Sequence, residues 1–171
     1  MIEEKIVISD TNIILDLISI NSLDSFFNLP CEFCTTDFVI SEIMQPNQIQ
    51  SIDKFIKSNK LEVITFDFKE LIEINNILSS VDNNVSITDC SVWYYAKKTD
   101  GRLLTGDGNL RKSAEKDNVK VSGILYVFDN LVEYEILAES EAAELLTILL
   151  NINTRLPAEE CKKRINQWRK S

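Results

Sequence analysis

The sequence alternates short apolar segments with longer segments of helical periodicity, from residue 5 to about residue 122. The apolar segments are three to six residues long, as expected of short buried strands. We expect these strands at residues 5–9, 32–35, 61–66, 102–105 and 119–121. Strands that alternate with helices form a parallel sheet with helices on its faces. The sequence therefore predicts an α/β fold with a central, mostly parallel sheet of about four to five strands.

The end of the chain has a different pattern, because only helical periodicity is found after about residue 138. We expect two helices there, over residues 139–152 and 157–169. The sequence contains no internal repeat and no linker rich in Gly, Ser or Pro. We therefore predict one domain over residues 1–138 and an appended helical pair over residues 139–171.

Capping and breaking residues predict several helix boundaries. Thr36 or Asp37 is expected to cap the helix after the second strand, and Pro46 to end it. Met44 would then lie on the apolar stripe of that helix. Thr88 is a good N-cap for the helix that follows the long loop at residues 81–87.

The chain contains no histidine, which excludes several classes of site. Catalytic triads and zinc sites that use histidine are ruled out, so any acid–base or metal chemistry rests on carboxylates, amides, hydroxyls or lysines. No run of about 18 apolar residues is present, and the first residues have the wrong charge for a signal peptide. We therefore expect a cytoplasmic protein with no membrane partner.

The four cysteines are expected to be free thiols in such a protein. Cys31 and Cys34 form a single CxxC motif. Without a second pair or a histidine, this motif does not predict a structural zinc site. It also enters a strand, whereas a redox-active pair opens a helix, so no redox role is predicted.

The charge of the chain is acidic overall but unevenly distributed. The net charge is −9, which repels nucleic acid at long range. Residues 97–120 nevertheless hold seven basic residues against four acidic ones, and residues 161–171 hold five basic residues and no acidic one. Solvated helix faces explain both segments, and basic rims around an acidic centre are the alternative, which the sequence leaves open.

Four carboxylates are expected at one edge of the predicted sheet. Asp10 directly follows the first strand and Asp107 follows the fourth, so both project from the carboxyl edge, where open parallel sheets bind ligands. Glu42 lies on the helix after the second strand, and Asp89 opens the helix after the long loop. Each residue alone has a structural explanation as a helix cap, a turn residue or a surface residue.

Asp89 shares a helix face with Val92, Trp93 and Ala96, which places a carboxylate on an apolar stripe. A buried carboxylate is unfavourable unless it is paired or bound to a metal, although a negative charge also stabilises a helix start. The four carboxylates have no histidine or lysine in their segments and would repel one another. Mg²⁺ or Mn²⁺, which prefer oxygen ligands, would neutralise such a site.

Four segments that contain these carboxylates resemble, in order, the motifs of the PIN domain family, which includes the VapC-type toxins of toxin–antitoxin pairs. The segments are residues 8–12, 41–43, 88–93 and 104–111, and the resemblance covers about residues 5–135. It implies a PIN-like fold with catalytic and metal-binding carboxylates at Asp10, Glu42, Asp89 and Asp107. The supporting polar residues would be Asn12, Thr105 and Asn109.

The activity that this resemblance implies is an Mg²⁺- or Mn²⁺-dependent endoribonuclease, which hydrolyses phosphodiester bonds of single-stranded RNA. The implied role is the toxin of a type II toxin–antitoxin pair, with a small antitoxin protein as partner and a homodimer as the assembly. RNA-backbone contacts are expected from basic residues near two of the motifs. These residues are Lys97, Lys98, Arg102, Arg111 and Lys112.

Other functions fit some of the same residues. A PIN-like scaffold that binds RNA or protein without catalysis is the alternative, and it would show no Mn²⁺-dependent thermal shift. A dehalogenase-type phosphatase needs a second aspartate two residues after its nucleophile, where this chain has Asn12. A response-regulator receiver needs a lysine at the end of a late strand, where this chain has Thr105.

Overall fold

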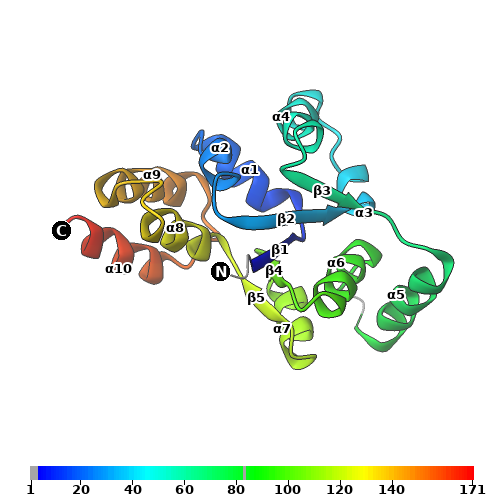
Figure 1. The fold of residues 1–171 in the computed structure, drawn as a ribbon. Helices are drawn as coiled ribbons and strands as arrows, with labels where there is room; N and C mark the ends of the chain where they lie inside the picture. The colour runs from blue at the N-terminus through cyan, green and yellow to red at the C-terminus, as the bar shows by residue number, and fades with distance from the viewer. Residues whose placement is uncertain (1–3, 83) are drawn as a thin grey trace. The chain divides into compact units, whose positions relative to one another are not determined.

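The computed structural model describes residues 4–82 and 84–171. In these residues five strands form one sheet, in the order β3-β2-β1-β4-β5 (Figure 1). The strands are β1 (Glu4–Ile8), β2 (Cys31–Thr36), β3 (Leu61–Ile64), β4 (Arg102–Leu104) and β5 (Lys120–Ser122). Every strand pair is parallel. The expected α/β fold with a parallel sheet flanked by helices is therefore confirmed.

Helices connect the strands and continue to the end of the chain (Figure 1). They are α1 (Thr11–Ser19), α2 (Leu23–Phe26), α3 (Asp37–Ser41), α4 (Pro46–Lys57), α5 (Phe68–Ser80), α6 (Ile87–Lys98), α7 (Gly108–Lys116), α8 (Ile124–Glu133), α9 (Glu139–Ile152) and α10 (Ala158–Trp168). None of the helices in the described residues is both long and apolar enough to cross a membrane.

Two predicted helix boundaries are wrong. Pro46 does not end the helix after β2, because α3 already ends at Ser41 and Pro46 lies in the first turn of α4, where a missing N–H is tolerated. Met44 is 84% exposed and so lies outside any apolar stripe. The N-cap of α6 is Ser86 instead of Thr88. Thr36 does cap α3, as one of the two expected residues.

The chain divides into two compact units. The first comprises the chain up to Ile13 and Pro30–Gly123, and it holds the sheet and α3 to α7. The second comprises Ile14–Leu29 and Ile124–Ser171, and it holds α2 and α8 to α10. The domain boundary that we expected after residue 138 stays a prediction.

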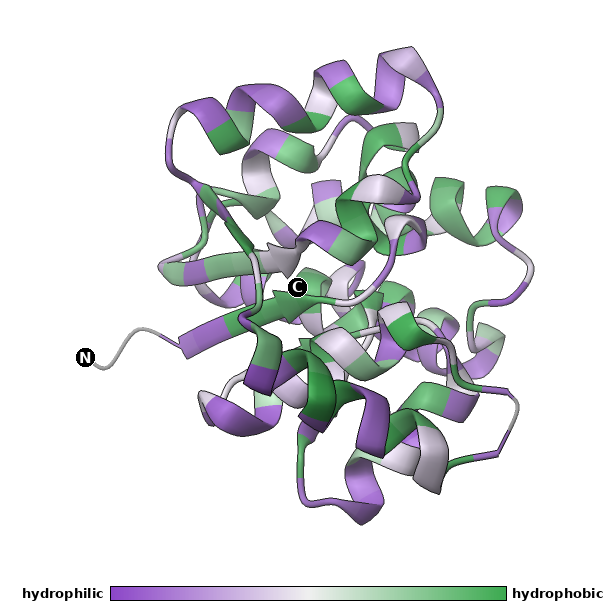
Figure 2. Ribbon diagram, turned by 90° about the vertical axis from the view of Figure 1, so that its right-hand side faces the viewer, coloured by the Kyte–Doolittle hydropathy of each residue, from purple (hydrophilic) through white to green (hydrophobic). Residues whose placement is uncertain are grey.

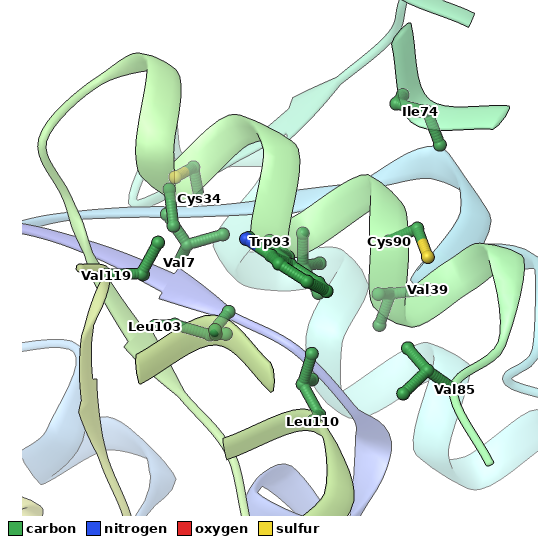
Figure 3. Packing of buried hydrophobic residues seen from close by; sticks show 13 residues of the cluster. Val7, Cys34, Val39, Ile74, Val85, Cys90, Trp93, Leu103, Leu110 and Val119 are labelled. Carbon is green, nitrogen blue, oxygen red and sulfur yellow. The ribbon is translucent and has the colours of Figure 1, made fainter. Parts of the chain in front are cut away.

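The core of the first unit lies between the sheet and α6. Helix α6 packs against β1, β2 and β4, and α3, α5 and α7 contact α6. The strand register aligns Val7 with Cys34 on one side and with Leu103 on the other, and all three side chains are buried. Figure 3 shows these side chains with the rest of the cluster, which includes Trp93 and Leu110 from α6 and α7. Burial raises the pKa of the Cys34 thiol to about 12.

The helices of the second unit pack on one another. Helix α9 contacts α8 and α10, and α2 contacts α8. Hydropathy along the ribbon alternates within the helices, as expected when one face of each is buried (Figure 2). The rings of Phe128 and Trp168 lie 6.4 Å apart, and Arg164 donates hydrogen bonds of 2.7 and 2.8 Å to the carboxylate of Asp129. Arg164, one of the basic residues of the C-terminal segment, therefore links α10 to α8.

Candidate functional site

The strand order places a ligand-binding position at the carboxyl ends of β1 and β4. From β1 the chain continues to β2 and β3 on one side, and then crosses to β4 and β5 on the other. Ligands of open parallel sheets bind where the order reverses in this way. Asp10 follows β1 and Asp107 follows β4, and the backbone N–H of Ser9 donates to the carbonyl of Leu104 at 3.1 Å. Both aspartates therefore lie at the carboxyl edge, as the sequence predicted, and the strand order places them at the reversal point.

Asp10 is held by the first turn of α1. Its Oδ1 accepts hydrogen bonds from the backbone N–H groups of Asn12, at 2.7 Å, and Ile13, at 3.3 Å. Asn12 itself is exposed, and it orients the Asp10 carboxylate through its backbone N–H group. Among the described residues, Oδ2 of Asp10 has no hydrogen-bond partner, which leaves this oxygen for a ligand.

Asp107 is held in the same way by the first turn of α7. Its Oδ1 accepts from the backbone N–H groups of Asn109, at 2.8 Å, and Leu110, at 2.9 Å. The buried hydroxyl of Thr105 accepts from the backbone N–H of Asp107 at 3.1 Å, and this bond shapes the turn between β4 and α7. Within the described chain, the other carboxylate oxygen of Asp107 is without a hydrogen-bond partner.

Asp89 and Glu42 are held by contacts that the sequence did not predict. Oδ2 of Asp89 accepts from the backbone N–H of Ser86 at 2.9 Å, while the Ser86 hydroxyl accepts from the backbone N–H of Asp89 at 3.0 Å. This reciprocal pair is a capping box. Glu42 lies one residue beyond α3, not on the helix as expected, and its Oε1 accepts from the Thr88 hydroxyl at 2.7 Å.

The four carboxylates act on one another electrostatically. Burial raises the pKa of Asp10, and the charges of Asp89 and Asp107 raise it further, against two backbone hydrogen bonds that lower it. Burial also raises the pKa of Asp89, and the charges of Asp107 and Glu42 add to this shift. Ionisation at this edge is therefore unfavourable without a nearby cation.

The donor set fits a hard divalent cation. It consists of oxygen atoms only, and each carboxylate uses one oxygen for a protein hydrogen bond. In residues 4–82 and 84–171, no group of three or more acidic, cysteine or histidine side chains is placed to hold a metal ion by itself. Mg²⁺ keeps several waters and is usually bound through one or two carboxylates, so an open arrangement suits it.

The five basic residues that we predicted do not lie together. Lys97 and Lys98 end α6, about 12 Å along the helix from Asp89 in its first turn. Arg102 begins β4, whereas Asp107 follows the end of that strand. These three residues are thus at the amino end of the sheet. They form ion pairs with Asp117, Glu70 and Glu4, respectively.

Arg111 and Lys112 are placed differently, because α7 begins at the carboxyl edge. The Arg111 guanidinium donates to the carbonyl of Val121 at 3.3 Å and to Glu115 at 3.4 Å. It also lies beside Gly123, where a Cβ atom would be 3.4 Å from one of its nitrogens. Lys112 is exposed.

Sequence reasoning missed several residues at the edge. Ser86 was overlooked because Thr88, two residues on, is an equally suitable cap by residue type. The Thr88 contact joins residues 46 positions apart, and no local pattern indicates it. Ser9, which precedes Asp10, is fully buried, and its hydroxyl has no hydrogen-bond partner in the described part of the chain.

These features define an open α/β protein with an acidic edge suited to a divalent cation. A family model described as PIN domain matches residues 6–170, and the chain belongs to the PIN domain family, whose members are in general nucleases. No curated protein matches the sequence. Among solved structures, FitAcB from Neisseria gonorrhoeae is similar to this chain, with 12% identity and a TM-score of 0.43 over 71% of this chain and 99% of that one.

The raised pKa of Asp10 generates a stability prediction. The pKa of Asp10 in the folded protein lies above the ordinary 3.8. The free energy of unfolding therefore falls as the pH rises from 3.8 through the folded-state pKa. Asparagine caps a helix as well as aspartate does, so Asp10→Asn keeps the cap and removes the charge. At pH 7 in EDTA we expect Asp10→Asn to be at least as stable as the parent, and Asp10→Ala to be about 1 kcal/mol less stable than Asp10→Asn. Urea unfolding measures both stability differences. An Asp10→Asn protein less stable than Asp10→Ala would contradict this prediction.

Proposed function

We propose that this protein is an endoribonuclease that requires Mg²⁺ or Mn²⁺ and hydrolyses phosphodiester bonds of single-stranded RNA. The observation that carries the proposal is that carboxylates from separate segments of the chain lie near enough at one sheet edge for their charges to raise the pKa of Asp10 and Asp89. Asp10, Glu42, Asp89 and Asp107 would hold the cation, one or two of them directly and the others through bound water. A bound divalent cation supplies a Lewis acid for the scissile phosphate and makes a water molecule acidic enough to attack it.

The chain itself contributes orientation and positive potential. Backbone amides fix Asp10 and Asp107, and the capping box fixes Asp89, so that three ligands are oriented before a cation binds. Asp10 and Asp107 directly precede α1 and α7, and Asp89 lies in the first turn of α6. Helix N-termini favour anions, and they therefore offset part of the repulsion between the acidic edge and an RNA phosphate.

RNA contacts at this edge would come from α7. Arg111 and Lys112 lie within its first half, and the Arg111 guanidinium is held beside Gly123, next to the end of β5. We therefore propose these two residues as the contacts to the RNA backbone. Lys97, Lys98 and Arg102 lie at the other end of the sheet and receive no role at the acidic edge in this proposal.

Cleavage of RNA tests the metal assignment. Asp89→Asn keeps an oxygen acceptor for Ser86 but removes the charge, so we expect the Mn²⁺-dependent rate on a single-stranded RNA to fall about a hundredfold or more with the fold intact. Asp53→Asn on α4, where the aspartate pairs with Lys57, is the matched control and should cleave at the parent rate. If Asp89→Asn cleaves like the parent, the assignment is wrong. A parent protein with neither cleavage nor a Mn²⁺-dependent thermal shift would support the non-catalytic scaffold instead.

Salt dependence tests the RNA contacts, with Asp89→Asn as the background so that RNA stays intact. Replacing both Arg111 and Lys112 by alanine removes two phosphate contacts, so the slope of log K against log salt should become shallower by about 1.4. Fluorescence anisotropy with a labelled RNA measures this slope. The double replacement of Lys97 and Lys98 is the control and should leave it unchanged. A change in the control, and none at Arg111 and Lys112, would move the RNA path to the amino end of the sheet.

We propose further that the protein is the toxin of a type II toxin–antitoxin pair, with a small antitoxin protein as its partner and a homodimer as its assembly. Membership of the PIN domain family supports this proposal. We expect a small protein to co-purify with the native chain and to suppress its cleavage of RNA. Mass spectrometry of the purified material and light scattering of the isolated chain measure the two associations, and an active, solitary monomer would contradict both.

A further inference from the structure

Three buried hydroxyl side chains form a hydrogen-bonded series that ends at Glu42. Thr36 caps α3, and Thr88 and Ser91 lie on α6. Their side chains are nearly or fully inaccessible to solvent. The hydroxyl oxygens of Thr36 and Ser91 are 2.9 Å apart, the Ser91 hydroxyl donates to the carbonyl of Thr88 at 2.6 Å, and the Thr88 hydroxyl donates to Oε1 of Glu42 at 2.7 Å.

The direction of every hydrogen bond in this series is determined. A hydroxyl group has one proton to donate, and Ser91 gives its proton to the Thr88 carbonyl. Thr36 must therefore donate to Ser91, which agrees with the bond of 3.4 Å that the Thr36 oxygen accepts from the backbone N–H of Val39. The Thr88 proton points to Glu42, and rotating it away would leave a buried donor unpaired.

The orientation of the Glu42 carboxylate depends on a side chain, the hydroxyl of Thr88. Glu42 lies just beyond α3, in a stretch without helix or strand that includes the exposed Met44. The three aspartates are fixed by backbone N–H groups, whereas the Thr88 hydroxyl is the hydrogen-bond donor to the Glu42 carboxylate within the described residues. A free glutamate side chain has many rotamers to lose when it binds a ligand. The Thr88 bond restricts them in advance.

We propose that Thr88 is a positioning residue for Glu42, and that Thr36 and Ser91 keep Thr88 in the required orientation. This inference rests on the proposed function, because it assumes that Glu42 contributes to the metal site. Hydrogen bonds to a ligating carboxylate orient it, and their loss typically weakens metal binding or activity 10- to 100-fold. The first turn of α6 would thus supply one ligand directly, through Asp89, and orient a second through Thr88.

The test is a Mn²⁺ titration by calorimetry on the parent chain and its variants. Thr88→Val keeps the shape of the side chain and removes the donor, so the Kd for Mn²⁺ should rise about tenfold. Thr88→Ser keeps a hydroxyl and should bind within about twofold of the parent. Adding Thr88→Val to Glu42→Gln should cause no further loss, because the carboxylate that Thr88 positions is already gone. RNA cleavage by Thr88→Val at saturating Mn²⁺ should recover to near the parent kcat.

Thr35→Val is the matched control. The Thr35 hydroxyl is also fully buried, and it donates to the carbonyl of Ile8 at 2.8 Å without contacting a carboxylate. Thr35→Val should lower the thermal unfolding temperature as Thr88→Val does, and leave the Kd for Mn²⁺ unchanged. An equal rise in Kd for both variants would show that Thr88 has only a structural role, and would overturn the proposal.

Two further outcomes separate this proposal from the proposed function. If Glu42→Gln weakens Mn²⁺ binding and Thr88→Val does not, the positioning role is wrong and the metal site stands. If Glu42→Gln binds Mn²⁺ as the parent does, Glu42 is not a ligand, and the assignment of Glu42 fails together with the role of Thr88. A loss in Thr88→Val that Thr88→Ser restores, with the control unchanged, supports the proposal.

Discussion

Repulsion between carboxylates governs the carboxyl edge of this sheet. Burial raises the pKa of Asp10 and of Asp89, and the charges of neighbouring carboxylates raise both further. The fold opposes this effect with backbone N–H groups, since Asp10, Asp89 and Asp107 each accept hydrogen bonds at the start of a helix. The charges of the site therefore lie directly before α1 and α7 and in the first turn of α6. Local helix formation and the chemistry of the edge depend on the same three side chains.

The distribution of cations follows from the direction of the strands. A parallel sheet has two chemically different ends, and in this chain Asp10 and Asp107 gather at the carboxyl end. Most basic residues of the segment at residues 97–120 form ion pairs away from that end, for example Lys97 with Asp117. Arg111 and Lys112 differ, because they lie on α7, which begins at the carboxyl edge. In the proposed function, a chain with a net charge of −9 contacts RNA through Arg111 and Lys112, on the helix that Asp107 caps.

The parts of this structure that local patterns determine were predictable from the sequence. Alternating strands and helices gave the parallel sheet, and the positions of Asp10 and Asp107 directly after strands gave their common edge. Boundaries where two residues compete for one role, such as Ser86 and Thr88 at the start of α6, were not predictable. The contact between Thr88 and Glu42 was also beyond local reasoning, because it depends on how α3 and α6 pack. The separation of Asp89 and Lys97, by contrast, follows from the helix rise alone and could have been inferred from the predicted helix.

Aspartates that begin helices have an evolutionary consequence for this edge. Aspartate and asparagine codons differ by one base, and the two residues are equivalent at the start of a helix. A single transition at the codon for Asp10 or Asp107 would therefore neutralise a charge while leaving the helix start in place. If the edge binds a cation as proposed, such a change would remove a ligand without unfolding the protein.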